Sequence, residues 1–118
     1  MVTFIETATF TRLITGLVPD DEYAAFQQEL ASNPERSGPL SGCGGVRKVR
    51  LAARGKGKSG GARVLYLPLP DHALIYLLYG LTKGDADNLS AAGKQAVREL
   101  ALQIKHAHHA PENPLQGK

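Results

Sequence analysis

The sequence predicts an α+β domain whose elements follow the order β-α-α-β-β-β-α. Short segments rich in Val, Ile, Tyr and Leu, either alternating or continuously apolar, are typical of strands. Other segments place apolar residues three and four apart, as amphipathic helices do, and Pro and Gly separate the two kinds of segment. Strands that follow one another directly indicate a mostly antiparallel sheet, with the helices expected on one face of it.

The first third of the chain is predicted to contain one strand and two helices. "MVTFIE" (1–6) alternates apolar and polar residues and is expected to be the first strand. "TATFTRLIT" (7–15) is expected to form a short helix that a proline stops. "DDEYAAFQQELASNP" (20–34) then predicts a second helix, with Asp20 or Asp21 as its N-cap and a proline at its end.

The next segments are predicted to build most of the sheet. "ERSGPLSGCGG" (35–45) has the composition of a loop. Three strands are expected after it, over 46–53, 62–69 and 73–81. The last two are separated only by the turn "PDH", so they are predicted to form a hairpin in the middle of the sheet.

The C-terminal part predicts a long amphipathic helix over residues 88–107, with Ser90 as its N-cap. We expect one domain over residues 1–107 and a flexible tail over 108–118. The stripe of the helix expected to face the sheet consists of Leu89, Val97, Leu100, Ala101 and Ile104.

The bulk composition narrows the class of protein. A hydrophobic fraction of 42% in 118 residues indicates one folded domain. The longest apolar run (73–81) is much shorter than the roughly 20 residues of a membrane span, and the first residues lack the pattern of a signal peptide. The single cysteine, Cys43, cannot form an internal disulfide and is expected to be an inert thiol. A cytoplasmic protein without membrane contact is therefore expected.

The charges are unevenly distributed along the chain. Residues 1–35 contain one basic and six acidic side chains, whereas residues 36–70 contain eight basic side chains and no acid. Half of the 14 Lys and Arg residues lie in "RKVRLAARGKGKSGGAR" (47–63). Such a concentration of positive charge attracts polyanions.

A nucleotide-phosphate loop does not explain this segment. "GKS" at 57–59 suggests one, but the first glycine of that motif would fall on Ala52, and a strand follows where a helix is needed. A solvated hairpin connection accounts for 54–61 but leaves the charged flanks unexplained. Side chains two apart on a strand share a face, so Lys48 and Arg50 are expected to project together.

Arg63 begins the neighbouring strand, and the glycine-rich turn allows this strand to lie beside the first. We therefore expect these cations and the loop lysines to line one surface that binds the phosphates of a nucleic acid. Tyr66 is a candidate for stacking on a base, although tyrosines of central strands commonly belong to the core. The residues expected to bind RNA around the site are Arg47, Arg54, Lys56, Lys58 and Tyr66.

The segment "GGVRKVRLAARGKGKSGGARVLYL…IYLLYGLTKGDADNLSAAGKQAV", after the β-α-α opening, resembles the toxins of the RelE/ParE superfamily. It is most similar to the HigB-type subgroup, over roughly residues 2–105. The resemblance implies a RelE-like fold and a type II toxin that cleaves mRNA in the ribosomal A site. It also implies a cognate antitoxin, which is expected to be a helix-turn-helix protein. The toxin would contact operator DNA only through this antitoxin.

The resemblance also assigns site residues. Lys48 and Arg50 match two basic residues of the family's second strand, Arg63 matches the arginine of its third strand, and Lys83 matches a basic residue after the last strand. Lys56 and Lys58 match the glycine-lysine loop of the subgroup. Many relatives have a further arginine and a tyrosine where this chain has Gly84 and, approximately, Ser90. "YLPLP" replaces the more usual tyrosine pair, so the general acid and base are left open.

RNA can be cleaved by attack of its own 2′-hydroxyl on the adjacent phosphate, which requires a proton acceptor, stabilisation of negative charge and a proton donor. Histidines lie only at a turn and near the C-terminus, and the basic strands contain no acid. Crowding by Arg50 and Arg63 is expected to depress the pKa of Lys48 and make a neutral fraction of it available. The forked, permanently charged guanidinium of Arg63 suits the phosphorane. The expected catalytic residues are Lys48, Arg50, Arg63 and Lys83.

No cofactor or metal is expected, because "HAHH" (106–109) lacks carboxylate or cysteine partners at suitable spacing. Two other functions stay open. A ParE-like gyrase inhibitor needs no phosphate-cleaving cluster, and the dense basic motif argues against it. A non-catalytic ribosome or RNA binder would block translation by occupancy alone.

Overall fold

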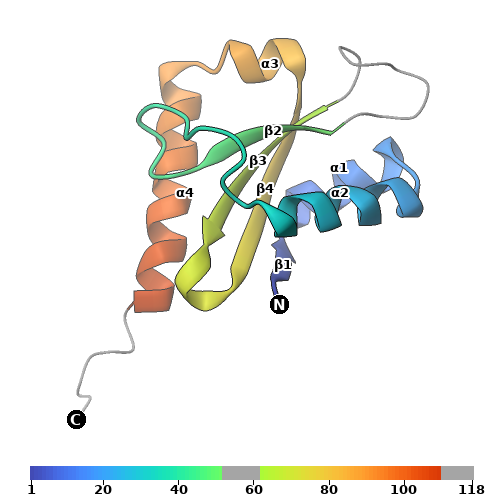
Figure 1. Ribbon diagram of the computed structural model, residues 1–118. Helices are drawn as coiled ribbons and strands as arrows, with labels where there is room; N and C mark the ends of the chain where they lie inside the picture. The colour runs from blue at the N-terminus through green and yellow to red at the C-terminus, as the bar shows by residue number, and fades with distance from the viewer. Residues whose placement is uncertain (52–61, 110–118) are drawn as a thin grey trace.

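The computed structural model describes residues 1–51 and 62–109, and its elements follow the predicted order with one added short helix, α3 (Figure 1). The elements are β1 (Thr3–Glu6), α1 (Ala8–Leu17), α2 (Asp20–Ser32), β2 (Arg47–Leu51), β3 (Ala62–Leu69), the 3-10 turn η1 (Pro70–His72), β4 (Leu74–Thr82), α3 (Lys83–Asp87) and α4 (Ala91–His109).

The four strands form one sheet in the order β1-β4-β3-β2. β1 pairs with β4 in parallel, and the other two pairs are antiparallel, so the predicted mostly antiparallel sheet is confirmed. The β3–β4 hairpin occupies the middle of the sheet, also as predicted. Its connection is η1, which ends at Ala73 in the left-handed conformation (φ 54°).

One face of the sheet is covered by α1 and α2 (Figure 1). Phe10 and Ile14 of α1 and Leu30 of α2 are buried there. The sheet contributes alternate residues of each strand to this core, namely Val49, Leu51, Val64, Tyr66, Ile75 and Leu77.

The opposite face is covered by α4, so the expectation that all helices lie on one face is wrong. Leu65 and Leu67 of β3 pack there with Val97 and Ala101 of α4. The physical reason lies in β3, whose apolar side chains point to both faces of the sheet, and each face needs its own cover. The predicted stripe of α4 is confirmed, with Leu89, Leu100 and Ile104 packed around the buried members.

The helix ends follow the sequence in part. The Ser90 hydroxyl accepts a hydrogen bond from the Gly93 amide (2.9 Å), as predicted for the start of α4. The N-cap of α2 is Pro19, without a side-chain hydrogen bond, instead of either aspartate. Helix α4 extends to His109, two residues into the segment predicted to be a tail; residues 110–118 lie outside the described part.

Among residues 1–51 and 62–109, no helix combines the length and the apolar character that crossing a membrane requires.

Candidate functional site

The pairing of β2 with β3 brings the predicted cations to one end of the sheet. Arg50 lies directly opposite Arg63, and Lys48 lies opposite Leu65. Directly paired residues share a face, as do residues two apart on a strand. Lys48, Arg50 and Arg63 therefore lie on the α4 face, while Val49 and Leu51 enter the other core.

Helix α3 adds Lys83 to this end of the sheet. It begins directly after β4, where the Thr82 hydroxyl accepts a hydrogen bond from the Asp85 amide (3.0 Å) and so caps the helix. Lys83 is the first residue of α3 and Asp87 is the last. The segment is only five residues long, which is too short for hydrophobic periodicity to reveal it.

Asp87 contacts both predicted catalytic lysines and was not itself among the predicted site residues. The Lys48 ammonium donates to Oδ1 of Asp87 (3.2 Å), and the Lys83 ammonium lies 3.4 Å from Oδ2. Hydrogen bonds from Lys48 and then Lys83 hold the pKa of the Asp87 carboxyl below its ordinary value. The spacing of Lys83 and Asp87 (i, i+4) could have signalled one of these contacts, but Lys48 is 39 residues away.

Arg63 has an unusual environment within this cluster. Its Nη1 atom is buried, and no hydrogen-bond partner for it is found among the described residues. A buried charged donor without a partner lowers the stability of the folded protein. Such a donor can readily donate a hydrogen bond to an oxygen atom of a ligand. We call the four cations Lys48, Arg50, Arg63 and Lys83 the basic cluster.

Arg47 lies on the other face of β2 and does not join the basic cluster. Its guanidinium donates to the backbone carbonyl oxygens of Glu35 (3.4 Å) and Ser37, and so fastens the loop that precedes β2. The RNA-binding role of Arg47 stays a prediction. Because neighbouring residues of a strand point to opposite faces, Arg47 would act apart from the basic cluster.

Tyr66 is a core residue, which corrects the expectation that it stacks on a base. It is fully buried, and its hydroxyl donates to the carbonyl oxygen of Pro34 (2.8 Å). Burial raises the pKa of Tyr66. No ring face is left for a ligand.

Three of the predicted RNA-binding residues, Arg54, Lys56 and Lys58, lie outside the described residues. Two of the departures from the family pattern, Gly84 and Ser90, can be located in the structure. A Cβ atom at Gly84 would meet nothing within 4 Å. Ser90 serves as the cap of α4.

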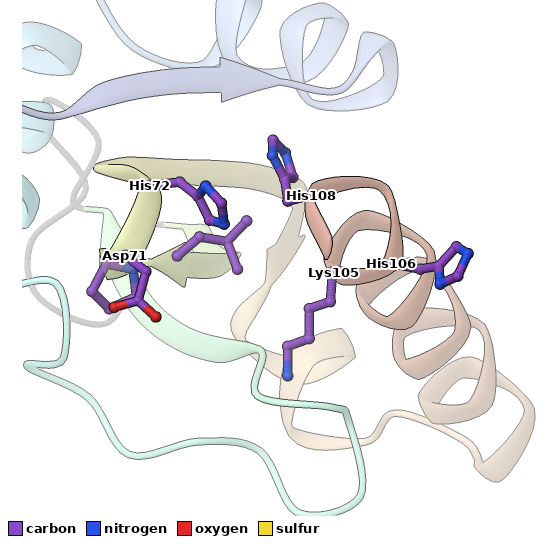
Figure 2. Close-up of a pocket in the computed structure, with 7 residues that line it drawn as sticks. Asp71, His72, Lys105, His106 and His108 are labelled. Atoms are coloured by element: carbon purple, nitrogen blue, oxygen red, sulfur yellow. The ribbon is translucent and has the colours of Figure 1, made fainter. Parts of the chain in front are cut away.

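A hollow of about 410 Å³ lies at the other end of the sheet, between η1 and the end of α4 (Figure 2). His72 and His108 face each other across it, with ring centroids 5.0 Å apart, and Tyr76 Oη is 2.7 Å from Nε2 of His108. The sequence separates these histidines too widely to predict the contact. No group of three or more metal-ligating side chains occurs among the described residues.

This hollow is separate from the basic cluster. Arg63 is the second residue of β3, whereas Leu69, which lines the hollow, is the last. Six residues of extended strand span about 20 Å. We therefore place the candidate functional site at the basic cluster alone.

The four-stranded sheet, with two N-terminal helices on one face, a C-terminal helix on the other and a cationic end, is consistent with the fold of the RelE-like toxins. The family model described as "RelE toxin of RelE / RelB toxin-antitoxin system" matches residues 20–115. The chain therefore belongs to the RelE toxin family, whose members are toxins of toxin–antitoxin systems and generally act as ribonucleases. A cognate antitoxin is the general partner of such a toxin.

Proposed function

We propose that this protein is a ribosome-dependent mRNA endonuclease of the HigB type that inhibits translation, and that the basic cluster is its active site. The observation that carries the proposal is the convergence of Lys48, Arg50 and Arg63 on one face, next to Lys83. Cations gathered on one surface bind the closely spaced phosphates of a polyanion. Its antitoxin is proposed to be a helix-turn-helix protein.

Arg63 is proposed to stabilise the phosphorane. The reaction puts extra negative charge on the phosphate oxygens, and a permanently charged guanidinium binds two of them at once. The buried Nη1 atom, unpartnered among the described residues, is a donor that such an oxygen would satisfy. Desolvation of this atom strengthens its interaction with the developing charge.

Lys48 and Lys83 are proposed to bind the scissile phosphate through their ammonium groups. The contact of both with Asp87 does not exclude this role. Asp87 is 43% exposed, and exposed ion pairs are weak because water and salt screen their charges. A phosphate of the substrate can therefore replace the carboxylate.

The ribosome is proposed to supply what the cluster lacks. A set of cations without a dedicated proton donor is a weak catalyst, because neither the hydroxyl nor the leaving oxygen is held in line. Holding reacting groups in an attack geometry can lower a reaction barrier by up to roughly 7–11 kcal/mol. Part of this gain is proposed to come from the way the ribosome holds the mRNA. Cleavage is therefore expected on programmed ribosomes, with little on free RNA.

Arg63→Ala tests the proposal. Induction of the wild-type protein is expected to produce new, in-frame mRNA 5′ ends by primer extension, and Arg63→Ala is expected to reduce them at least a hundredfold, the typical loss for one oxyanion donor. Arg12→Ala removes the same charge from α1, on the opposite side of the sheet, and should cleave like the wild type. The same comparison with purified protein, with and without programmed ribosomes, tests ribosome dependence.

Two outcomes would contradict the proposal. Arrest of translation with intact mRNA would indicate an occupancy inhibitor. DNA damage with intact mRNA would indicate a gyrase inhibitor.

A further inference from the structure

Asp87 bridges two lysines of the basic cluster. Its two oxygens face two ammonium groups that come from different elements, Lys48 from the edge strand β2 and Lys83 from the start of α3. A phosphodiester likewise presents two charged oxygens on one centre, and lysine ammonium groups bind carboxylate and phosphate oxygens alike. The carboxylate thus lies between the two ammonium groups.

The carboxylate does not have the properties of a proton acceptor. Its pKa lies below the ordinary value, chiefly because Lys48 donates a hydrogen bond to it. A base with a low pKa takes a proton from a hydroxyl poorly. The contact therefore points to a part in arranging the lysines.

Helix α3 holds Asp87 in place while leaving it accessible. Ala86, the preceding residue, is buried and anchors the short helix, whereas the Asp87 side chain is 43% exposed. Because the carboxylate is exposed, a ligand can approach it from the solvent.

We propose that Asp87 is a positioning residue of the basic cluster: its carboxylate holds the Lys48 and Lys83 ammonium groups together at the place of an RNA phosphate, and the phosphate displaces it on binding. This inference rests on the proposed function in taking RNA as the ligand. In the free protein, the Asp87 carboxylate holds the two ammonium groups close together despite their like charge. It also lowers the affinity for RNA, because RNA binding has to break both contacts with Asp87.

Affinity for a short single-stranded RNA oligonucleotide, measured by fluorescence anisotropy without ribosomes, tests the proposal. Asp87→Asn is expected to bind about three- to tenfold more tightly than the wild type, the gain from releasing two exposed ion pairs. Asp85→Asn is the matched control, since it makes the same charge change on the same helix, and no salt bridge of Asp85 occurs among the described residues. It should change the affinity less than twofold.

A second background isolates the lysines. In a Lys48→Met/Lys83→Met protein, Asp87→Asn should tighten binding no more than Asp85→Asn does. Equal effects of the two aspartate substitutions in the wild-type background would overturn the proposal, because they would show a general charge effect.

The ionisation of Asp87 provides a direct readout that a merely structural carboxylate would not give. Its carboxyl carbon, followed by NMR in the wild-type protein, should titrate at low pH in the free state and closer to the ordinary range with RNA bound. An unchanged titration with RNA bound would also overturn displacement. These measurements do not involve cleavage, so failure of the nuclease proposal would appear separately, as intact mRNA in the Arg63 experiment.

Discussion

At the scale of single residues, the sequence identifies a chemical group but the surroundings decide its use. Lys48 and Tyr66 were both expected at the RNA surface. Lys48 lies on the α4 face beside the other cations, whereas Tyr66, on the opposite face of the neighbouring strand, is enclosed by the helices α1 and α2. Both belong to strands with the same alternation, so the face that each presents decides between ligand and core.

Tyr66→Phe tests the assignment of this ring to the core. Removing the hydroxyl leaves the Pro34 carbonyl without its donor and should lower the free energy of unfolding by about 0.5–1.5 kcal/mol, measured by urea denaturation. Affinity for the RNA oligonucleotide should stay within twofold of the wild type. A selective loss of RNA affinity at unchanged stability would instead return Tyr66 to the binding surface.

At the scale of elements, the loop before β2 determines how α4 sits on the sheet. Gly42, Gly44 and Gly45 all have positive φ, and Gly44 lies against α4, where a Cβ atom would come within 3.2 Å of the Cβ atom of Ala101. The same loop buries Cys43 and Val46 in the core beneath α4. The glycines therefore permit both the turn and the close approach.

Substitution of two of these glycines separates the two effects. Gly42→Ala has open space around the new methyl group and should lose about 1 kcal/mol of stability, the cost of the left-handed conformation alone. Gly44→Ala adds the contact with Ala101 and should lose about 2 kcal/mol or more. Thermal or urea unfolding compares the two variants. Equal losses would mean that the approach of the loop to α4 is not tight.

At the scale of the whole molecule, the two faces of the sheet differ in charge. The acidic residues at the start of α2 belong to the side that carries α1 and α2, whereas the basic cluster lies on the α4 side. The basic cluster therefore attracts a polyanion to the α4 side of the molecule. This arrangement would orient the protein as it approaches RNA.

The salt dependence of RNA binding tests this picture. Each phosphate contact with single-stranded RNA is expected to add about 0.7 to the slope of log K against log salt concentration. Arg63→Ala should reduce the slope by about that amount, and Arg12→Ala should leave it unchanged. The measurement is a series of binding isotherms at increasing KCl concentration. Identical slopes for the two variants would show that binding is not localised at the basic cluster.

The sequence predicted most elements because their signals are local. The range predicted for β3 is identical to the observed Ala62–Leu69, and Ser90 caps α4 as its position indicated. The short helix α3 was not predicted, because five residues are too few to show the hydrophobic periodicity of a helix. The division of the helices between two faces was also missed, although the nearly continuous apolar run of β3, a strand predicted to be central, is typical of a strand buried on both faces.

The sequence by itself determined the strands and helices, the antiparallel hairpin at the centre of the sheet, and the presence of a dense group of cations, because these follow from spacing and composition over a few residues. Only the tertiary structure decided that Arg50 faces Arg63, that Arg47 and Tyr66 turn to the other face, and that Asp87 reaches Lys48. The physical reason is range. Register and side-chain contacts between residues far apart in the chain depend on how the two cores pack, and no local pattern encodes that packing.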